Sequence, residues 1–284
     1  MNTAVLSLDI EDWYHLDYLS SSEASRTYSM LDGLDVYQEI IDSYGISSSF
    51  FVLGELVPEI KRKLRNLARD GHDIGSHGQS HDRPLTMSIP SFEDEIKTCK
   101  NDLEMVLGNP VHGFRAPCFS LDRERLDVIQ KVGYDFDASL IKFGDHSLYG
   151  EIDLRGYNKI GDGLYTNNDF FEFETSTLRI ANRHVPVSGG GYLRIFPWLL
   201  MERLLDRFLV ENDFFSLYIH PFELSRKNIP PFPLGTKLTN KFRFSIGRDS
   251  TEQKLRLLIE KLISHGFKFE TYWSTKRKSL LPNQ

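Results

Sequence analysis

The stretch TAVLSLDIEDW (residues 3–13) joins an apolar run to a cluster of carboxylates. Residues 3–10 have the composition of a buried strand. Asp9, Glu11 and Asp12 follow within four residues at its end. In parallel α/β folds the working residues lie at the carboxyl ends of the strands, so these acids are candidates for a functional site. On their own they would equally suit a solvated loop that caps a helix.

The remainder of the chain alternates strand-like and helix-like segments, which predicts a mostly parallel sheet that is closed or nearly closed as a barrel, with helices outside it. Between residues 141 and 195 the pattern is irregular, with several short β-like pieces. The expected strands are 3–10, 47–54, 72–78, 111–117, 134–140, 214–224 and 267–273, and the expected helices are 35–45, 58–72, 91–108, 122–134, 197–211 and 251–266.

Composition favours one large soluble domain that covers residues 1–284. Hydrophobic residues make up 40% of the 284 positions, and no linker rich in Pro, Gly or Ser divides them. The net charge of −6 argues against a nucleic-acid partner. The N-terminus lacks the pattern of a signal peptide, and no apolar run is long enough to span a bilayer. We therefore expect a cytoplasmic protein with reduced cysteines.

The segment DIGSHGQSHD (residues 73–82) places His77 and His81 four residues apart. On a helical turn this spacing puts both imidazoles on one side, although alone it is a weak signal. The expected sheet brings the pair to the same edge as Asp9 and Asp12. Two histidines and one carboxylate form the protein ligand set of catalytic zinc or non-haem iron sites.

Three further polar residues follow expected strands. His220 in SLYIHPFEL is placed to protonate a leaving group, or else ends a core strand with a backbone hydrogen bond. Arg115 in GFRAP is expected to pair with a carboxylate, and Asp137 in DFDASL is a candidate partner. A surface salt bridge is the alternative for both.

Five motifs occur in one order along residues 5–220: LDIED, SHGQSH, FRAP, DASL and LYIH. In this order they resemble the polysaccharide deacetylases with the NodB-homology domain, carbohydrate esterase family four. The resemblance implies a distorted (β/α) barrel with about seven parallel strands. The stretch SGGGYLRIFP (residues 188–197) resembles a segment of a branch associated with exopolysaccharide and O-antigen biosynthesis.

The resemblance also implies roles for individual residues. Asp9 is similar to the family's catalytic base and His220 to its catalytic acid, while Arg115 orients the base and Asp137 lines the site. His77 and His81 are the implied metal ligands. Asp12 is the preferred third ligand, because a short carboxylate is the family's usual ligand. Glu11 is the alternative, because other branches of the family space the two acids as Asp-x-Asp. The residues expected to contact the sugar are Tyr192, Arg194 and Trp13.

The implied activity is metal-dependent hydrolysis of an N-acetyl or similar acyl group on an amino sugar of a surface polysaccharide or its precursor. One divalent ion is expected, Zn²⁺ first, with Ni²⁺ or Co²⁺ as alternatives. The expected substrate partner is a glycan or a nucleotide- or lipid-linked sugar. Two other functions stay open: an amidase acting on a small cyclic amide or ureide, and an inactive carbohydrate-binding homologue.

Overall fold

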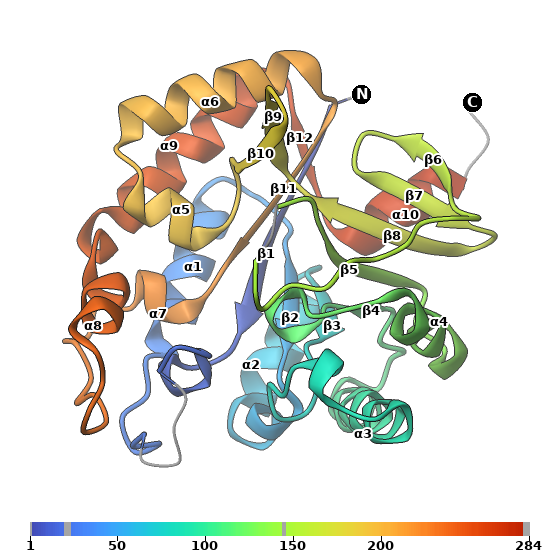
Figure 1. The fold of residues 1–284 in the computed structure, drawn as a ribbon, viewed down its shortest axis with the longest axis horizontal. Helices are drawn as coiled ribbons and strands as arrows, with labels where there is room; N and C mark the ends of the chain where they lie inside the picture. The colour runs from blue at the N-terminus through green and yellow to red at the C-terminus, as the bar shows by residue number, and fades with distance from the viewer. Residues whose placement is uncertain (1, 20–23, 144–145, 281–284) are drawn as a thin grey trace.

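The centre of the computed structural model, which describes residues 2–19, 24–143 and 146–280, is a largely parallel sheet (Figure 1). Within this part of the chain, seven parallel strands lie in the order β11-β1-β2-β3-β4-β5-β8. Their bounds are β1 Thr3–Ile10, β2 Ser49–Val52, β3 Asp73–Ser76, β4 Gly113–Phe114, β5 Phe136–Ile141, β8 Phe170–Thr175 and β11 Phe214–Ile219.

The two outer members of this order meet and nearly close a barrel. Ser176, just after β8, donates its N–H to Ser216 O at 3.5 Å, and the Ser216 N–H donates to Ser176 Oγ at 2.9 Å. β12 (Lys268–Glu270) pairs with the start of β1. The expected distorted (β/α) barrel with about seven parallel strands is therefore confirmed.

Helices cover the outside of the barrel (Figure 1). α4 begins after Asp122, whose carboxylate accepts the Arg125 N–H, and ends at Gly133 with a left-handed φ of 94°. The helix bounds are α1 Asp32–Ser43, α2 Val57–Arg69, α3 Ile89–Leu107, α4 Arg123–Val132, α5 Gly190–Ile195, α6 Trp198–Glu211, α7 Pro221–Leu224, α8 Leu238–Ser245, α9 Thr251–Ser264 and α10 Tyr272–Leu280, with 3₁₀ turns η1 Trp13–His15, η2 Gly54–Leu56, η3 Pro84–Thr86, η4 Pro117–Phe119 and η5 Arg248–Ser250.

The pleat of β1 divides its side chains between two environments. Ala4, Leu6, Leu8 and Ile10 belong to the core between sheet and helices, while Val5 belongs to the apolar cluster inside the barrel. Because side chains alternate along a strand, Ser7 and Asp9 lie on the same face as Val5. The inward face of β1 therefore changes from apolar to polar towards its carboxyl end.

The irregular region contains two antiparallel additions to the barrel. β7 (Leu164–Asn167) pairs with β8 and with β6 (Asn158–Gly161), and β9 (Thr177–Ile180) pairs with β10 (Arg183–Pro186). The bounds of several predicted elements were wrong. The expected strand 214–224 ends at Ile219, and its last four residues, Pro221–Leu224, form α7. The last expected strand ends at Glu270, and α10 follows it.

α3 also begins earlier than expected, because Ser88 caps it by accepting the Ser91 N–H.

α1 packs closely against α7, the short helix that follows His220. A Cβ on Gly33 would lie 1.8 Å from Pro221 O. We predict that Gly33→Ala lowers the free energy of unfolding by about 1–3 kcal/mol through overpacking, although alanine is the better helix former. Urea unfolding checks this. Gly161→Ala is the control, since its Cβ would lie 3.8 Å from Leu164 Cβ. Equal stability of the two variants would contradict the tight contact.

Candidate active site

A pocket of about 320 Å³ lies at the carboxyl edge of the parallel strands and contains most of the sequence-predicted residues. We call it the carboxyl-edge pocket. The predicted residues that line it are Asp9, Glu11, His77, His81, Tyr192, Arg194 and His220. They come from positions that span more than 200 residues, and the sheet brings them together because the strands run in one direction.

Glu11, His77 and His81 form the one group of potential metal ligands among the residues that the structure describes, with ligand atoms within 4.8 Å of one another. Glu11 Oε2 lies 2.5 Å from His81 Nε2 and 4.0 Å from His77 Nε2. All three side chains are almost completely buried. The arrangement supplies two imidazole nitrogens and one carboxylate from a single side of the pocket.

The structure does not bring Asp12, the preferred third ligand, to the two histidines; the alternative, Glu11, lies beside them instead. Asp12 Oδ1 accepts the backbone N–H groups of Trp13 and Met30, both at 2.8 Å, so this carboxylate caps η1 and joins it to the segment before α1. After the pleated strand β1 ends, the chain turns between Glu11 and Asp12. The turn leaves only Glu11 facing the two histidines.

The chemistry of this group fits a divalent ion. Glu11 Oε2 is buried without a well-oriented hydrogen-bond donor among the described residues, which suits an atom aimed at a cation. His77 Nδ1 lies 2.9 Å from Arg115 O, and donation to that carbonyl leaves Nε2 as a ligand atom. Burial lowers the pKa of His77 to about 4, so its imidazole is neutral at pH 7, the form that binds metals.

Asp9 and Arg115 form a buried ion pair beside the metal-ligand group. Arg115 Nη1 donates to Asp9 Oδ1 and to Ser7 Oγ, both at 2.7 Å, and Nε donates to Ala138 O at 3.0 Å. Nη2 donates to the Tyr272 hydroxyl at 2.8 Å. These fixed contacts orient the Asp9 carboxylate.

His220 lies across the pocket, with Nε2 3.5 Å from Glu11 Oε1. Its Nδ1 is 3.2 Å from Glu223 Oε2, and the same carboxylate oxygen accepts the His220 backbone N–H. Burial opposes a charge on this imidazole, but the Glu11 and Glu223 carboxylates raise the pKa of His220 to about 9. The imidazole is therefore predominantly protonated at neutral pH.

Arg194 was predicted to contact sugar, but its guanidinium is used within the protein. Nη1 donates to the carbonyl oxygens of Arg243, Phe244 and Ile246, each at 2.8 Å, and Nε lies 3.4 Å from Glu223 Oε1. The residue is 3% exposed. The Arg194 guanidinium therefore contacts Glu223 and not a sugar, and Glu223 in turn holds His220.

Two of the three glycines of SGGGYLRIFP lie against protein side chains, whereas Gly191 lines the carboxyl-edge pocket. A Cβ on Gly190 would lie 1.8 Å from Glu223 Oε2, and one on Gly189 would lie 2.9 Å from the Tyr218 ring. These positions therefore make room for Glu223 and Tyr218 at the floor of the pocket.

Trp13 is the other predicted sugar contact that the structure corrects. Its side chain is fully buried in an apolar cluster with Leu16, Met30 and Phe244, and Nε1 donates to Tyr28 O at 2.6 Å. Tyr192 does line the carboxyl-edge pocket. It joins an aromatic wall that sequence reasoning missed, formed by Tyr18, Phe119, Tyr149, Tyr218 and Phe222.

Asp137 is neither a partner of Arg115 nor among the residues that line the carboxyl-edge pocket, so both expectations are corrected. Its carboxylate accepts the N–H and the hydroxyl of Ser139, both at 2.8 Å. Glu172 lies opposite Asp137 in the register of β5 and β8, and both are completely buried. Asp137 therefore supports the strand behind the pocket.

Backbone strain concentrates around the carboxyl-edge pocket. Among the described residues, five that are not glycine have a positive φ. Three of them, His81, Cys118 and Phe119, line this pocket, with φ values of 64°, 54° and 52°. Such conformations cost energy and persist where the surrounding structure holds them, which is typical of functional sites.

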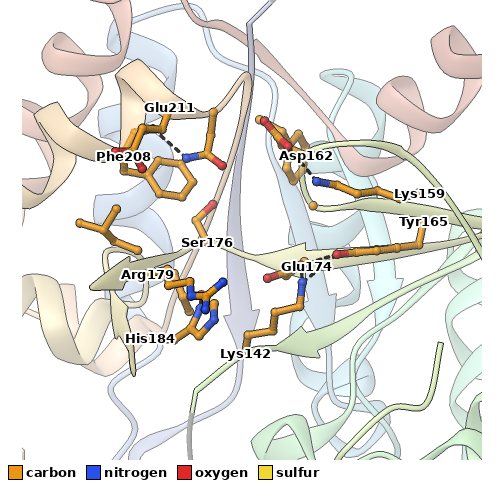
Figure 2. A pocket seen from close by; sticks show the side chains of 15 residues that line it. Lys142, Lys159, Asp162, Tyr165, Glu174, Ser176, Arg179, His184, Phe208 and Glu211 are labelled. Atoms are coloured by element: carbon orange, nitrogen blue, oxygen red, sulfur yellow. Dashed lines mark hydrogen bonds and ion pairs between the residues drawn. The ribbon is translucent and has the colours of Figure 1, made fainter. Parts of the chain in front are cut away.

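A second pocket, of about 250 Å³, lies between β8, the β9–β10 hairpin and the end of α6 (Figure 2). Its charged side chains point to one another: Lys142 pairs with Glu174 at 2.8 Å, and Lys159 with Asp162 at 3.0 Å (Figure 2). These pairs leave little unbalanced charge for a ligand. The reactive groups are gathered in the carboxyl-edge pocket instead.

The fold is that of a NodB-like α/β barrel, as comparison with solved structures shows. A Mycobacterium smegmatis protein assigned to the polysaccharide deacetylases is similar over all of this chain and 93% of its own, with a TM-score of 0.63 and 15% identity. The CE4 domain of a multidomain xylanase from the hindgut metagenome of Trinervitermes trinervoides covers 100% of this chain and 94% of its own, with a TM-score of 0.52 and 14% identity.

Sequence comparison relates part of this chain to the polysaccharide deacetylases. Residues 34–136 match the family described as polysaccharide deacetylase, and residues 142–274 match a domain of unknown function, DUF3473. A peptidoglycan deacetylase of Helicobacter pylori is 22% identical over 38% of this chain and 37% of its own length. A peptidoglycan deacetylase-like protein of Gibberella zeae is 24% identical over 44% and 36%. The matches thus span little more than a third of these relatives.

One structural relative is described as a CE4 family pseudoenzyme. It comes from Bacillus anthracis and is similar over 97% of this chain and 65% of its own, with a TM-score of 0.55 and 13% identity. This fold therefore also occurs in a protein described as a pseudoenzyme, so the fold alone does not indicate catalysis.

None of the helices in the described residues is long and apolar enough to cross a membrane.

The two candidate third ligands are separable by metal binding. We predict that Glu11→Gln weakens zinc affinity by more than about 100-fold, because even residues that only support a ligand are worth 10–100-fold. Asp12→Asn should keep near-wild-type affinity, since an amide oxygen still caps η1. Calorimetric zinc titration measures both, and circular dichroism controls for folding. Loss of affinity in Asp12→Asn with retention in Glu11→Gln would reverse the assignment.

The buried acids Asp137 and Glu172 predict a pH dependence of stability. Burial raises the pKa of Asp137 to about 6, and burial together with the Asp137 charge raises that of Glu172 well above its ordinary value. In the unfolded chain both carboxyls lose their protons near pH 4 (about 3.9 and 4.3). The folded state therefore retains protons that the unfolded state has lost, and stability should fall as pH rises from about 4 through 6.

Glu172→Gln replaces one of these two titrating carboxyls with an amide of similar shape. The free energy of unfolding of this variant, relative to that of the wild type, should rise between pH 5 and pH 8. Urea unfolding at several pH values measures this difference. Glu151→Gln is the control, because Glu151 is exposed. A constant difference between Glu172→Gln and the wild type over that range would contradict the raised pKa values.

Proposed function

We propose that this chain is a metal-dependent hydrolase that removes an N-acetyl group from an amino sugar. The observation that carries the proposal is the meeting of three groups in one pocket: the Glu11–His77–His81 cluster, the Asp9–Arg115 pair and His220. The cluster can hold a divalent ion. The Asp9 carboxylate can accept a proton, and the His220 imidazolium can donate one. Metal-assisted amide hydrolysis uses all three functions.

Glu11, His77 and His81 would hold the ion, which when bound supplies Lewis-acid polarisation and makes water acidic near neutral pH. Asp9 accepts a proton from the attacking water while Arg115 holds its carboxylate in position. The water oxygen forms a bond to the acetyl carbon, and the amide C–N bond breaks. Protonated His220 gives its proton to the departing nitrogen, so that acetate and the amine leave.

The backbone of η4 offers a donor for the developing oxyanion. Ala116 N–H donates to Ser139 Oγ, Phe119 N–H donates to Ala116 O, and Pro117 has no N–H. We therefore assign this role to the backbone N–H of Cys118, whose residue lines the carboxyl-edge pocket. The left-handed backbone of Cys118 and Phe119 shapes the turn that carries this group.

The substrate we propose is a surface polysaccharide or its nucleotide- or lipid-linked precursor. The stretch SGGGYLRIFP supports the branch associated with exopolysaccharide and O-antigen biosynthesis. The aromatic wall that includes Tyr149, Tyr192 and Tyr218 suits stacking on sugar rings. We propose Zn²⁺ as the metal, with Ni²⁺ or Co²⁺ as alternatives, and the cytoplasm as the place of action.

We further propose that residues 1–284 form one domain. β1 to β5 lie before residue 142, where the DUF3473 match begins, while β8 and β11 lie within that match. β1 pairs with β11, and β5 pairs with β8. Strands from both halves of the chain are therefore needed to complete one barrel.

Acetate release from N-acetylated amino-sugar oligosaccharides tests the activity with the zinc-loaded protein. Asp9→Asn and His220→Gln should each lower kcat by about 10²- to 10⁴-fold, because each removes a proton-transfer group. Zinc content, measured in parallel, should stay near that of the wild type. His184→Gln is the matched histidine control, since His184 lines the other pocket.

Other products would identify other functions. Near-wild-type turnover in Asp9→Asn or His220→Gln would remove the role assigned to that residue. Ring-opened acid from a cyclic amide, without acetate from sugars, would identify the amidase. Glycan binding without turnover by the zinc-loaded wild type would identify an inactive binding protein.

A further inference from the structure

The segment between Glu223 and Asp249 is strongly basic in a chain of net charge −6. It contains no Asp or Glu. Its six cationic residues are Arg226, Lys227, Lys237, Lys241, Arg243 and Arg248. We call residues 224–248 the basic segment. It consists of a loop, α8 and the start of η5, and α8 with its loop lies at the edge of the molecule, away from the sheet (Figure 1).

The basic segment also exposes large apolar side chains. Leu234 is 94% exposed, Leu238 81%, Phe242 66% and Ile229 50%. Leu238 and Phe242 are four residues apart in α8 and therefore share one face, and Lys237 and Lys241 repeat with the same spacing beside them. Apolar residues concentrated in this way on a surface mark an interaction site.

The two lysines of α8 are the cations of this segment that are open to an external partner, since no carboxylate among the described residues lies within ion-pair distance of Lys237 or Lys241. Other cations make contacts within the protein: Lys227 Nζ donates to Ser29 O at 2.7 Å, and Arg248 Nε donates to Phe222 O at 3.1 Å. Arg226 pairs with Glu39 and Glu252 at 3.2 Å.

The inner face of the basic segment is fixed to the carboxyl-edge pocket. Asn240 Nδ2 donates to Tyr18 O at 2.9 Å, and the Arg243 guanidinium lies 4.3 Å from the centre of the Tyr18 ring. Phe244 stacks on Phe222 with ring centres 5.1 Å apart. Tyr18, Phe222 and Arg243 all line the pocket. Whatever binds the outer face is thus held beside the pocket opening.

We infer that the basic segment docks the protein on the surface of an anionic lipid bilayer. Its lysines match the negative charge of the headgroups, and Leu234, Leu238 and Phe242 can enter the boundary between headgroups and acyl chains. A soluble acidic glycan would attract the lysines but would leave these apolar side chains in water. The inference goes beyond the proposed function, and together with it would place a lipid-linked sugar within reach of the pocket.

Vesicle sedimentation tests the docking without any substrate, so the result is independent of whether the chain is a deacetylase. The full chain should bind vesicles of phosphatidylcholine and phosphatidylglycerol, and bind pure phosphatidylcholine vesicles more weakly. The triple variant Leu234→Ser/Leu238→Ser/Phe242→Ser should bind at least about tenfold more weakly, because it loses apolar insertion. Lys237→Glu/Lys241→Glu should lose the preference for phosphatidylglycerol and the sensitivity to salt.

A matched control variant replaces exposed apolar residues with serine on another helix, outside the basic segment. Leu199, Leu200 and Val210 are also exposed, but they lie on a separate helix, α6, which runs along the top of the view in Figure 1 and is apart from α8. Leu199→Ser/Leu200→Ser/Val210→Ser should bind vesicles like the wild type. Circular dichroism checks folding, and Leu238→Ser alone replaces the triple variant if that variant is unfolded.

Two outcomes would overturn the inference. The first is a wild type that does not bind the anionic vesicles. The second is binding that the lysine variant abolishes and the serine variant leaves unchanged, accompanied by equally strong binding to soluble alginate. This second result would assign the segment to an acidic polysaccharide.

Discussion

The buried guanidinium of Arg115 is the constraint on which the rest of the structure depends. A cation without exposure to solvent costs several kcal/mol unless it is paired and fully hydrogen-bonded. Here β1 supplies Asp9 and Ser7, β5 supplies Ala138 O, and α10 supplies Tyr272. Satisfying this one group requires a barrel whose elements come from both ends of the chain. The same arrangement holds the Asp9 carboxylate in the orientation that a proton acceptor needs.

Order in the carboxyl-edge pocket comes from supporting contacts more than from the reactive residues themselves. His77 is held by a backbone carbonyl, and His220 by Glu223, which Arg194 approaches from α5. Gly190 lies so close to Glu223 that no side chain fits there. The positive φ of His81 shows that the loop is held against its own local preference. Catalytic geometry in this fold is therefore distributed over loops that are far apart in sequence.

The barrel was largely predictable from sequence, because buried strands and amphipathic helices alternate with clear periods. The hairpins of residues 158–186 were not, since β6 is mostly exposed and carries no apolar alternation. The positions of polar residues at the ends of predicted strands pointed to the site residues Asp9, His77, His81, Arg115 and His220. Which of Glu11 and Asp12 faces the two histidines depends on the turn after β1, and residue propensities do not specify that turn. Glu223 could have been found from the sequence, because it follows the helix cap His220 by three residues and can accept the His220 N–H. No sequence pattern pointed to Tyr272.

Tyr272 has a consequence for the order in which the protein can be assembled. Its hydroxyl bonds both Arg115 and Ser216, and its ring packs against Phe51, Phe136 and Phe173 within the barrel. A ribosome adds this residue after every strand of the barrel has been made. During synthesis the guanidinium thus lacks one of its partners, and the growing chain holds an unfinished interior. The set of contacts that fixes Arg115, and through it Asp9, is therefore complete only once α10 is present.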